Sequence, residues 1–502
     1  MLAETALPSG MESIFAGALI VYLIALYGIG FLAQRRVKNV EDFVLAGRRL
    51  PTSLATITII ATWFGAESLM TTADEVGNEG LRKAMLDPIG ISACLLLAGL
   101  FVAGPMWRMG ILTIPDFFNR RYGKTAEILS SLIIVPSYFG WVAAQFVALA
   151  QLLDVFFGIP KEWGITAVAT LGTGYTLLGG MWTITWTDAI QMTFILIGLI
   201  LLGHAILVDL GDGSLSSGLS VMQTDIPAQR WRIADPPTFW RDTLTAISAL
   251  AIGALGNLPM QDLMQRIFSA KSDTVASRAC LWAAAGYLIM GILPIGAGMA
   301  AHLLLPQHGG DFDGVVLLVA SKLLNPILLL VFFLAIVSAV LSTIVSAVMA
   351  PAAVMAHNLA EPVWRRSRKT APTQQGLLWL QRIAIVIVTI ASAWLAYKGE
   401  GAYELVQGSY SMPLVSLFVP FIIGIHFKRV PPLAAILAMV FGITPWCMHM
   451  LVGWEIFLEP WLEAAGLPVP HELAGTLCSL IGFLIGAALG RVNSTDPQAA
   501  TS

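Results

Sequence analysis

The sequence predicts an all-α membrane protein with thirteen transmembrane helices. Apolar residues make up 57% of its 502 residues and charged residues only 12%, whereas an average soluble domain carries about 25% charged residues. The apolar residues also gather into runs of about 20, the length of helix that crosses a hydrocarbon core ~30 Å thick. These observations exclude a soluble enzyme.

The positive charges give the predicted spans a direction. Of the 28 Lys and Arg residues, 19 lie in loops on one side and 8 in loops on the other, with Arg382 inside a span. Because cytoplasmic loops collect Lys and Arg, we expect a multi-pass protein of a bacterial inner membrane or plasma membrane, with its N-terminus outside and its C-terminus in the cytoplasm. The spans are expected near 13–33, 52–73, 88–107, 128–157, 163–178, 189–207, 242–260, 279–304, 326–350, 376–397, 408–426, 433–452 and 474–490.

The net charge and the cysteines argue against several kinds of partner. A net charge of −3 without a Lys/Arg-rich tail argues against nucleic acid, and no pattern indicates a protein partner. The four cysteines lie in apolar runs and have no paired spacing: Cys94, Cys280, Cys447 and Cys478. This pattern indicates buried thiols and argues against a disulfide framework or a metal site. The lipid bilayer is the partner that composition predicts.

Two predicted spans contain residues that interrupt helices. The second has Gly65 at its middle, and the seventh has Gly253, Gly256, Asn257 and Pro259. Interrupted helices at corresponding places of two repeats are typical of transporter binding sites. The alternative interpretation is close helix packing at glycine and a simple kink at proline.

The spacing of these two spans predicts an internal repeat. They lie five spans apart and therefore cross in opposite directions, as an inverted repeat of five helices requires. The whole chain, 1–502, is then one transporter domain, with one extra helix before the repeats. The repeats are expected at 52–207 and 242–426, and two additional helices at 433–490.

Glu67 is the only acidic residue that we expect near the middle of a span. A carboxylate inside a membrane is costly and usually faces a cavity or a partner, so it indicates function. The alternative is a structural hydrogen bond to backbone N–H groups that the helix break at Gly65 leaves free.

A stripe of hydroxyl groups follows the ninth span. Ser338, Ser342 and Ser346 recur every four residues and share one helix face, with Thr343 beside Ser342. Hydroxyl oxygens are hard ligands that suit Na⁺. Serine in membrane helices also bonds back to its own helix or permits close packing, and this alternative stays open at this point.

Aromatic residues lie near the middle of the second and fourth spans. The faces of Trp63, Tyr138, Phe139 and Trp141 are of the kind that attracts organic cations, although such residues also serve ordinary packing. The sequence shows no HExxH, GxSxG or glycine-rich phosphate loop. We therefore expect no enzyme active site.

Five segments resemble the sodium:solute symporter family along nearly the whole chain: AGRRLP at 46–51, ATWFGAES at 61–68, YTLLGGMWTITWTDAIQ at 175–191, QRIFSAKS at 265–272 and SAVLST at 338–343. The resemblance implies a LeuT-like fold of five plus five helices, with Na⁺ as the coupling ion. By position, it also implies Na⁺ ligands from the carbonyls of Ala61, Phe64 and Ala339 and the hydroxyls of Ser342 and Thr343. We interpret the other two serines of the stripe, Ser338 and Ser346, as packing residues.

Within the family the sequence is most similar to the high-affinity choline transporter branch, through ATW and the following glycine, PIG at 88–90, GLFVAGPM at 99–106 and YGK at 122–124. Trp63 and Trp141 match the aromatic cage of that branch. Ile91 stands where the branch has tyrosine, and Met260 where it has tryptophan. Glu67 replaces a glycine, and a Glu at this place is similar to the sugar-transporting branch.

The predicted function is Na⁺-coupled symport of a small polar organic solute by alternating access, with a preference for an amine or other organic cation. Symport of a sugar, an amino acid or a carboxylate is the alternative. A non-transporting membrane sensor and a polytopic membrane enzyme are hypotheses from other classes. The predicted substrate contacts are Trp63, Gly65, Glu67, Ser68, Tyr138, Trp141, Asn257, Met260 and Gln261.

Overall fold

The computed structural model describes residues 11–35, 37–306, 312–399, 401–427, 429–454, 456–462 and 468–491, and within these ranges every regular element is a helix. The first half of the chain forms α1 (Met11–Gln34), α2 (Val40–Leu45), α3 (Thr52–Trp63), η3 (Glu67–Thr71), α4 (Thr72–Glu79), η4 (Leu81–Met85), η5 (Leu86–Gly90), α5 (Ile91–Leu97), η6 (Ala98–Val102), α6 (Ala103–Arg108), α7 (Ile114–Tyr122), α8 (Lys124–Phe157), α9 (Lys161–Leu210) and α10 (Leu215–Asp225).

The second half continues the bundle after two short 3₁₀ turns. Its helices are α11 (Phe239–Ala251), η9 (Ile252–Gly256), α12 (Gln261–Ser269), α13 (Asp273–Leu304), α14 (Val315–Leu323), α15 (Pro326–Val354), η11 (Met355–Ala360), α16 (Glu361–Arg368), α17 (Gln374–Tyr397), α18 (Ala402–Ser416), α19 (Phe418–His426), α20 (Pro432–Val452), α21 (Glu459–Leu462) and α22 (His471–Leu489). Two isolated β-bridges, Leu50 with Ala270 and Ile456 with Pro470, join loops.

The predicted count of thirteen spans is not confirmed. Among the described residues, nine helices are long and apolar enough to cross a membrane, and three bent helix pairs raise the number to as many as twelve. The predicted span 163–178 forms the first part of α9, which continues past a non-helical residue, Gly180. Gly180 has φ +56°, and a Cβ there would lie 2.3 Å from the carbonyl oxygen of Phe43, so the continuous chain can turn here only because the residue is glycine.

The breaks predicted in the second and seventh spans are confirmed. Thr52–Trp63 and Glu67–Glu79 meet at 66°, and Pro236–Gly256 and Gln261–Ser269 meet at 42°. A third bend, 47° between α18 and α19, was not predicted from the sequence. Pro420 explains it, because proline has no N–H to donate to the carbonyl one turn earlier.

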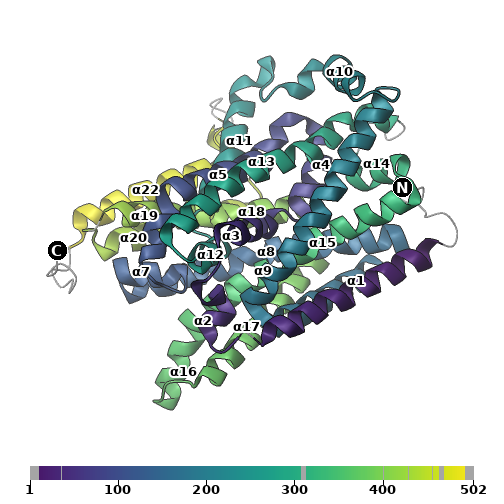
Figure 1. The fold of residues 1–502 in the computed structure, drawn as a ribbon. Helices are drawn as coiled ribbons and strands as arrows, with labels where there is room; N and C mark the ends of the chain where they lie inside the picture. Colours follow the sequence, from purple (N-terminus) through teal and green to yellow (C-terminus); the bar gives the residue numbers. More distant parts are fainter. Residues whose placement is uncertain are drawn as a thin grey trace.

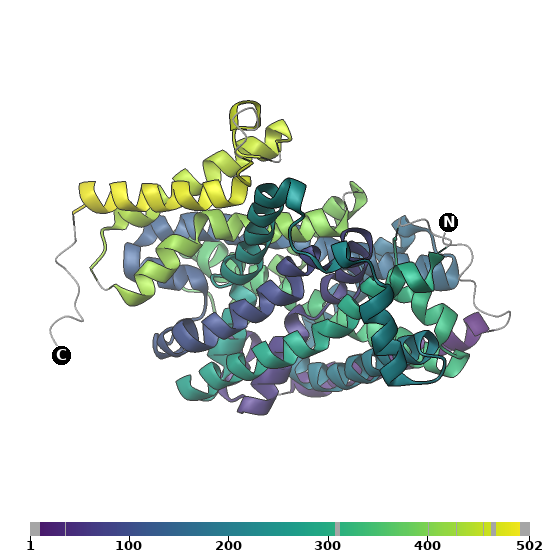
Figure 2. The same cartoon turned by 90° about the horizontal axis from the view of Figure 1, so that it is seen from above.

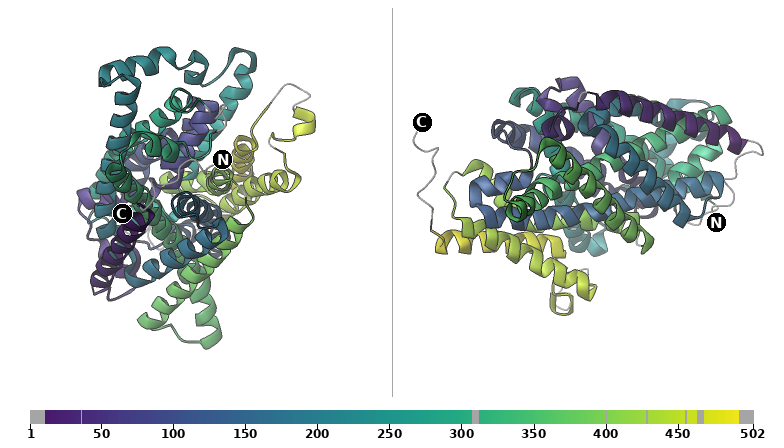
Figure 3. Two further views of the ribbon diagram at one scale, coloured as in Figure 1. Left: turned by 90° about the vertical axis from the view of Figure 1, so that its right-hand side faces the viewer. Right: turned by 90° about the horizontal axis from the view of Figure 1, so that it is seen from below.

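The broken helices lie inside the bundle and the additional helices lie outside it. Most of α8 and α15 is buried by neighbouring helices, whereas most of α1 is exposed. Figure 3 shows α1 on one edge of the bundle and α22 on the opposite edge. Figure 2 shows the C-terminal helices as a separate layer on one side. The exposed apolar side chains of α1 and α22 are those expected to face lipid.

The two ends of the bundle differ in what covers them. The segment 208–241, between the predicted spans 189–207 and 242–260, carries the short surface helix α10. This helix lies with α14 towards one end of the bundle, while α7 and α16 lie towards the other (Figure 1). We call these the α10 end and the α16 end. The site described next lies between them, where the broken helices meet α8, α15 and α18.

Candidate functional site

The break after α3 frees a backbone carbonyl and turns it towards α15. The amide of Gly65 donates to the carbonyl of Trp63 at 2.8 Å, so it does not continue the helix by bonding to Ala61. The hydroxyl oxygen of Ser342, on α15, lies 3.1 Å from the carbonyl oxygen of Ala61 instead. Two of the predicted Na⁺ ligands are therefore neighbours, although 281 residues separate them in sequence.

Thr343 supplies a polar atom without a partner beside this break. Its hydroxyl oxygen is buried and makes no hydrogen bond within the part of the chain that the structure describes. A Cβ on Gly65 would lie 2.5 Å from that oxygen, so only glycine lets the break come so close. Phe64 adjoins Gly65, and Ala339 lies one helical turn before Thr343. A buried, unpaired hydroxyl at the break that frees the carbonyl of Ala61 is a donor set that fits a hard cation.

Asp188 adds a carboxylate to this group of oxygens. Its Oδ1 lies 2.6 Å from the hydroxyl of Ser342, and its Oδ2 accepts a hydrogen bond from Thr58 on α3. Asp188 is fully buried. The sequence analysis assigned residues 179–188 to a loop, but α9 continues through them and carries Asp188 into the bundle.

Glu67 lies at the start of the segment after the break and accepts three hydrogen bonds. The indole N–H of Trp141 donates to Oε1 at 2.8 Å, and the hydroxyl of Tyr410 lies 3.4 Å from the same oxygen. The amide of Gln145 donates to Oε2 at 2.5 Å. Glu67 is only 3% exposed, so this carboxylate stays in the bundle only because polar groups surround it.

Gln145 also caps the helix that starts at Glu67. Its Oε1 accepts the free backbone N–H of Ala66 at 2.9 Å. The sequence analysis did not single out Gln145, although helical spacing gives a signal for it, because Gln145 follows Tyr138 and Trp141 on one face of α8. Tyr410 was missed for a different reason, since the break that Glu67 borders lies more than 300 residues away in the chain.

Asp262 forms a second carboxylate centre, on α12 just after the other break. Trp63 donates its indole N–H to Oδ2, and the hydroxyl of Tyr138 donates to Oδ1 at 2.5 Å. Both aromatic residues are buried. The ring centroids of Tyr138 and Trp141 lie 5.8 Å apart, and those of Trp141 and Tyr410 lie 5.9 Å apart. The aromatic rings thus link the two carboxylate centres.

A third carboxylate, Asp87, lies next to Ser68. The hydroxyl of Ser68 donates to Oδ2 of Asp87 at 2.6 Å, and the hydroxyl of Tyr287 lies 3.1 Å from the same oxygen. Asp87 is near enough to Glu67 for the two charges to repel each other. The sequence analysis placed Asp87 just outside the third span.

The predicted contacts on the second broken helix are divided between two places. Asn257 donates to the carbonyl of Gly253 at 3.0 Å, and its own Oδ1 is buried without a partner among the described residues. Met260 is fully buried just before Asp262. Gln261 turns towards the α16 end, where its Oε1 accepts the backbone N–H of Ile114 at 2.8 Å. Its assignment as a substrate contact stays a prediction.

One buried cation faces these carboxylates. The guanidinium of Arg266, on α12, donates to the hydroxyl of Ser346 at 2.5 Å and acts electrostatically on Asp188 and Asp262. The sequence analysis placed Arg266 in a loop, and its expectation that Glu67 is the only acidic residue near the middle of a span is wrong. Both errors have one cause: the helices continue beyond the breaks and carry into the bundle charged residues that hydropathy assigns to loops.

The remaining hydroxyls and aromatic side chains have local partners. Ser338 bonds to Tyr22 on α1 at 2.6 Å and to the carbonyl of Leu334 at 2.6 Å, which agrees with the packing interpretation. Phe139 is half-buried and packs against the hydrophobic core. The four cysteines are all free thiols.

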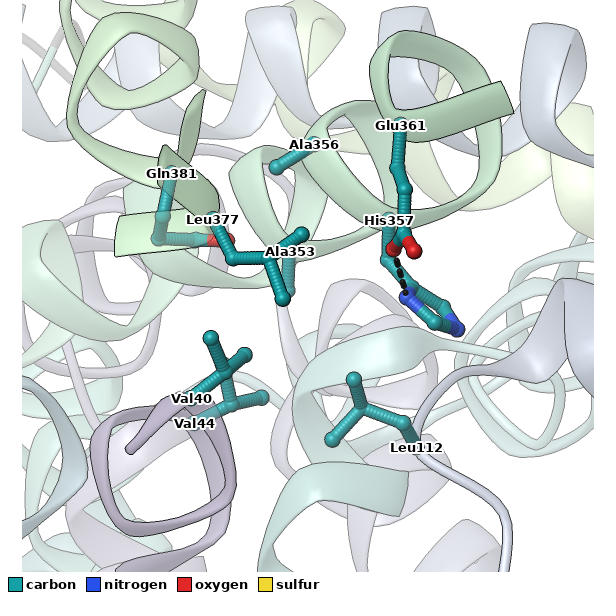
Figure 4. A pocket seen from close by; sticks show the side chains of 9 residues that line it. All are labelled: Val40, Val44, Leu112, Ala353, Ala356, His357, Glu361, Leu377 and Gln381. Atoms are coloured by element: carbon teal, nitrogen blue, oxygen red, sulfur yellow. Dashed lines mark hydrogen bonds and ion pairs between the residues drawn. The ribbon is translucent and has the colours of Figure 1, made fainter. Parts of the chain in front are cut away.

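A small pocket lies apart from these groups, near the α16 end. Apolar side chains of α2 and α15 line it together with Gln381, His357 and Glu361. Figure 4 shows the hydrogen bond between His357 and Glu361 at its edge, which measures 3.1 Å. None of the predicted Na⁺ or substrate residues lines this pocket.

Helices that are interrupted next to buried charged residues, in a bundle with an apolar outer surface, are typical of a secondary transporter. A model of the sodium:solute symporter family matches residues 43–442. The chain belongs to the sodium:solute symporter family. It is therefore a multi-pass membrane transporter that couples a small solute to Na⁺, and not an enzyme.

Individual relatives agree with this assignment. The high-affinity choline transporter 1 of Drosophila melanogaster is 26% identical over 435 residues, which are 84% of this chain and 67% of that protein. The sodium/proline symporter of Salmonella typhimurium is 24% identical over 485 residues, which are 93% of this chain and 92% of that protein. The outward-open structure of a Na⁺-coupled sialic acid symporter superposes with a TM-score of 0.78 at 19% identity, over 96% of this chain and 99% of that one. The last comparison shows a shared fold.

Proposed function

We propose that this chain is a symporter that imports a small organic cation, such as an amine or quaternary ammonium compound, together with Na⁺. One observation carries the choice of solute: three buried carboxylates, Glu67, Asp87 and Asp262, lie among buried aromatic rings. Aromatic faces and carboxylates are the groups that hold an ammonium ion. A neutral sugar or an organic anion would leave this negative charge uncompensated.

The balance of charge supports the same choice. With Asp188 included, the site holds four buried carboxylates and one buried guanidinium, that of Arg266. Buried charges are stable only when other charges and hydrogen bonds compensate them. Na⁺ near Asp188 and an organic cation near Glu67 would supply the missing positive charge.

For Na⁺, the proposed ligands are the carbonyls of Ala61, Phe64 and Ala339 and the hydroxyls of Ser342 and Thr343. Asp188 would accept the hydrogen of the Ser342 hydroxyl and leave the oxygen lone pairs for the ion. Since α3 belongs to the first proposed repeat and α15 to the second, Na⁺ would hold the two repeats together. Its release would let them separate.

For the solute, the proposed contacts are Trp63, Gly65, Glu67, Ser68, Tyr138, Trp141, Asn257, Met260 and Gln261. We add Gln145 and Tyr410 to this proposal because both bond to Glu67. The unpaired Oδ1 of Asn257 is an acceptor that suits the N–H or O–H group of a bound amine. Glu67 gives charge, and Trp141 holds that carboxylate in place.

The proposed orientation puts the α10 end outside and the α16 end in the cytoplasm, as the distribution of Lys and Arg predicts. The repeats are proposed to span 52–207 and 242–426, and the bends of 66° and 42° at their first helices support this. Inward Na⁺ movement then drives uptake, with about 2.3 kcal/mol per charge for 100 mV of membrane potential and about 1.4 kcal/mol for a tenfold Na⁺ gradient.

The test is uptake into proteoliposomes with an inward Na⁺ gradient and, as the control, an equal K⁺ gradient. The solutes are choline, ethanolamine, proline, glucose and acetate. We expect Na⁺-dependent uptake of at least one of the two cations. Uptake of only the neutral sugar or the anion would overturn the proposed solute class, and no Na⁺-dependent flux of any solute would favour the sensor hypothesis.

A further inference from the structure

A lysine ammonium group lies in an aromatic and acidic setting at the α10 end. The Nζ of Lys83 lies 4.6 Å from the ring centroid of Tyr403. It also lies 2.8 Å from Oε2 of Glu75 and 3.0 Å from Oε1 of Glu79. A cation over an aromatic face with two carboxylates beside it is the arrangement in which proteins bind ammonium groups.

Glu75 lies on α4 and Tyr403 on α18, and the same stretches of chain carry a second carboxylate and tyrosine deeper in the bundle. Glu75 follows Glu67 by eight residues along η3 and α4, a rise of about 12 Å. Tyr403 precedes Tyr410 by seven residues on α18, a rise of about 10 Å. Glu67 and Tyr410 touch, with 3.4 Å between Oε1 and the hydroxyl oxygen. A carboxylate and a tyrosine therefore lie near each other twice, once in contact at the centre and once about two turns nearer the α10 end, where the ammonium group of Lys83 joins Glu75 to Tyr403.

Polar side chains continue between the two pairs. Gln407 lies one turn from Tyr403 and one turn from Tyr410, on the same face of α18. Its amide donates to Oε1 of Glu472 at 3.1 Å, and Glu472 also accepts the hydroxyl of Ser248 at 3.1 Å. Glu472 is only 3% exposed. The face of α18 from Tyr403 to Tyr410 thus meets carboxylates along its whole length.

The outer pair is within reach of solvent and the inner pair is not. The side chains of Lys83 and Glu75 are each 23% exposed, and that of Glu79 is 42% exposed. Tyr410 is fully buried. An ammonium ion that approaches from the α10 end meets Tyr403 and Glu75 before it meets Tyr410 and Glu67.

We propose that Glu75, Glu79 and Tyr403 form a second, outer binding site for an organic ammonium solute, which Lys83 fills with its own ammonium group until the solute displaces it. This inference rests on the proposed function, because a solute of another class would have no use for such a site. The solute pairs with Glu75 over the ring of Tyr403 and then moves along α18 to Glu67. Lys83 returns to the ring behind it and restores the charge balance of the outer site.

The test replaces the lysine by a thiol reporter, in Lys83→Cys. Two methanethiosulfonate reagents of similar size are compared, one with a trimethylammonium group and one with a sulfonate group. After division by their rates with a free thiol, we expect the cationic reagent to react about tenfold faster, because Glu75 has lost its lysine and Glu79 keeps only its pair with Arg82, 2.9 Å away. Wild-type protein gives the background from the native cysteines.

Protection by an ammonium ion tests occupancy directly. Tetramethylammonium is expected to slow the modification of Lys83→Cys, and the protection should weaken about tenfold when Tyr403→Leu is added, since the ring face is lost. Tyr403→Phe keeps the ring and should keep the protection. Equal rates for the two reagents, or no protection by tetramethylammonium, would overturn the outer site.

A further background separates this inference from the proposed function. The double variant Lys83→Cys with Glu67→Gln alters the inner site. We expect tetramethylammonium to protect the cysteine at position 83 in this variant as well. Protection without Na⁺-dependent uptake of any cation by wild-type protein would show the outer site and refute the proposed function. Uptake of a cation by wild-type protein, without protection of Lys83→Cys by tetramethylammonium, would support the proposed function and refute the outer site. If Lys83→Cys does not fold, Lys83→Met is used instead: it also frees the ring of Tyr403, and tetramethylammonium should stabilise it against heat unless Tyr403→Leu is added.

Discussion

The hydroxyl of Ser342 lies 2.6 Å from the carboxylate of Asp188 and 3.1 Å from the carbonyl oxygen of Ala61. One small side chain on α15 thus connects α9 and the broken end of α3. If its hydrogen goes to the carboxylate, its lone pairs are left for an ion beside Thr343, the next residue of α15. An ion bound there would change the contact between three helices at once, which is what coupling of Na⁺ to a conformational change requires.

Removal of either proposed hydroxyl ligand is expected to weaken Na⁺ binding. In Ser342→Ala and in Thr343→Val, the Na⁺ concentration for half-maximal uptake should rise about tenfold, since a contact to a charged group contributes about 1.5–3 kcal/mol. Uptake at varied Na⁺ concentration measures this. Ser338→Ala, one turn away with its hydroxyl bonded to Tyr22, is the control. If both variants keep the wild-type Na⁺ dependence, the assignment of these ligands is wrong.

Asp188→Asn should have a larger effect than the loss of one hydroxyl. The amide keeps the size of the side chain but removes the negative charge that would balance Na⁺, and it leaves the buried Arg266 with less compensation. We expect the Na⁺ requirement to rise more than tenfold, as measured by Na⁺-dependent uptake and by stabilisation against heat in Na⁺ relative to K⁺.

The control for Asp188→Asn is Asp209→Asn, because Asp209 is an exposed carboxylate on the same helix. An unchanged Na⁺ requirement in Asp188→Asn would show that the carboxylate supports Ser342 only structurally.

Glu67→Gln tests the solute class. The amide can still accept the indole N–H of Trp141, so the packing is kept while the charge is lost. We expect the KM for a cationic solute to rise at least tenfold, with little change in the Na⁺ requirement. Glu41→Gln, on an exposed carboxylate paired with Arg48, is the control. A variant that transports the same cation with an unchanged KM would contradict a direct role for Glu67.

The signals that the sequence gives about this site are local ones. Gly65 interrupts a run of apolar residues, and Ser342 belongs to a four-residue repeat, so each can be recognised within one segment. The structure confirms the break at Gly65 and brings Ser342 to it. The break at Gly65 belongs to the predicted fold, and Ser342 is a predicted Na⁺ ligand. The predicted ligand therefore lies at the predicted helix break.

The charged residues of the site could not be placed in this way. Asp188 and Arg266 lie where the hydropathy falls, and such positions are normally counted as loops. Their burial depends on a helix that continues through Gly180 and on another that resumes after Pro259. The partner of Asp188 is 154 residues away, on Ser342. Only the three-dimensional arrangement reveals that these charges compensate one another.

Gly65→Ala is expected to disrupt the ion site. The new Cβ would lie 2.5 Å from the hydroxyl oxygen of Thr343 and 2.7 Å from Oε1 of Gln145, so at least one of these side chains must move. We expect loss of most Na⁺-dependent uptake and a melting temperature in detergent that no longer rises with Na⁺. Gly296→Ala on α13, where a Cβ meets nothing within 4 Å, should leave both properties unchanged. Full Na⁺ stabilisation in Gly65→Ala would contradict this arrangement.

The α16 end contains a carboxylate that makes stability depend on pH. Asp116, on α7, lies 3.4 Å from Nε2 of His357 and accepts the amide of Asn358 at 2.9 Å. Burial by itself raises the pKa of Asp116, but the hydrogen bond and charge of His357, with the other donors, lower it from 3.8 to about 2. A carboxyl group whose pKa is lowered by folding stabilises the folded state above its unfolded pKa, and this contribution is lost as the pH falls from about 4 to about 2.

Asp116→Asn should therefore lower the melting temperature in detergent by a few degrees near neutral pH. The difference from wild type should shrink as the pH falls from about 4 to about 2, because the unfolded chain binds a proton at this carboxyl group before the folded protein does. Asp154→Asn, on an exposed carboxylate at the end of α8, is the matched control and should show no such trend. A difference between wild type and Asp116→Asn that stays constant down to about pH 3 would mean that the amide acts by altered packing. His357→Gln should reproduce the loss seen near neutral pH, because it removes the group that holds the carboxylate ionised.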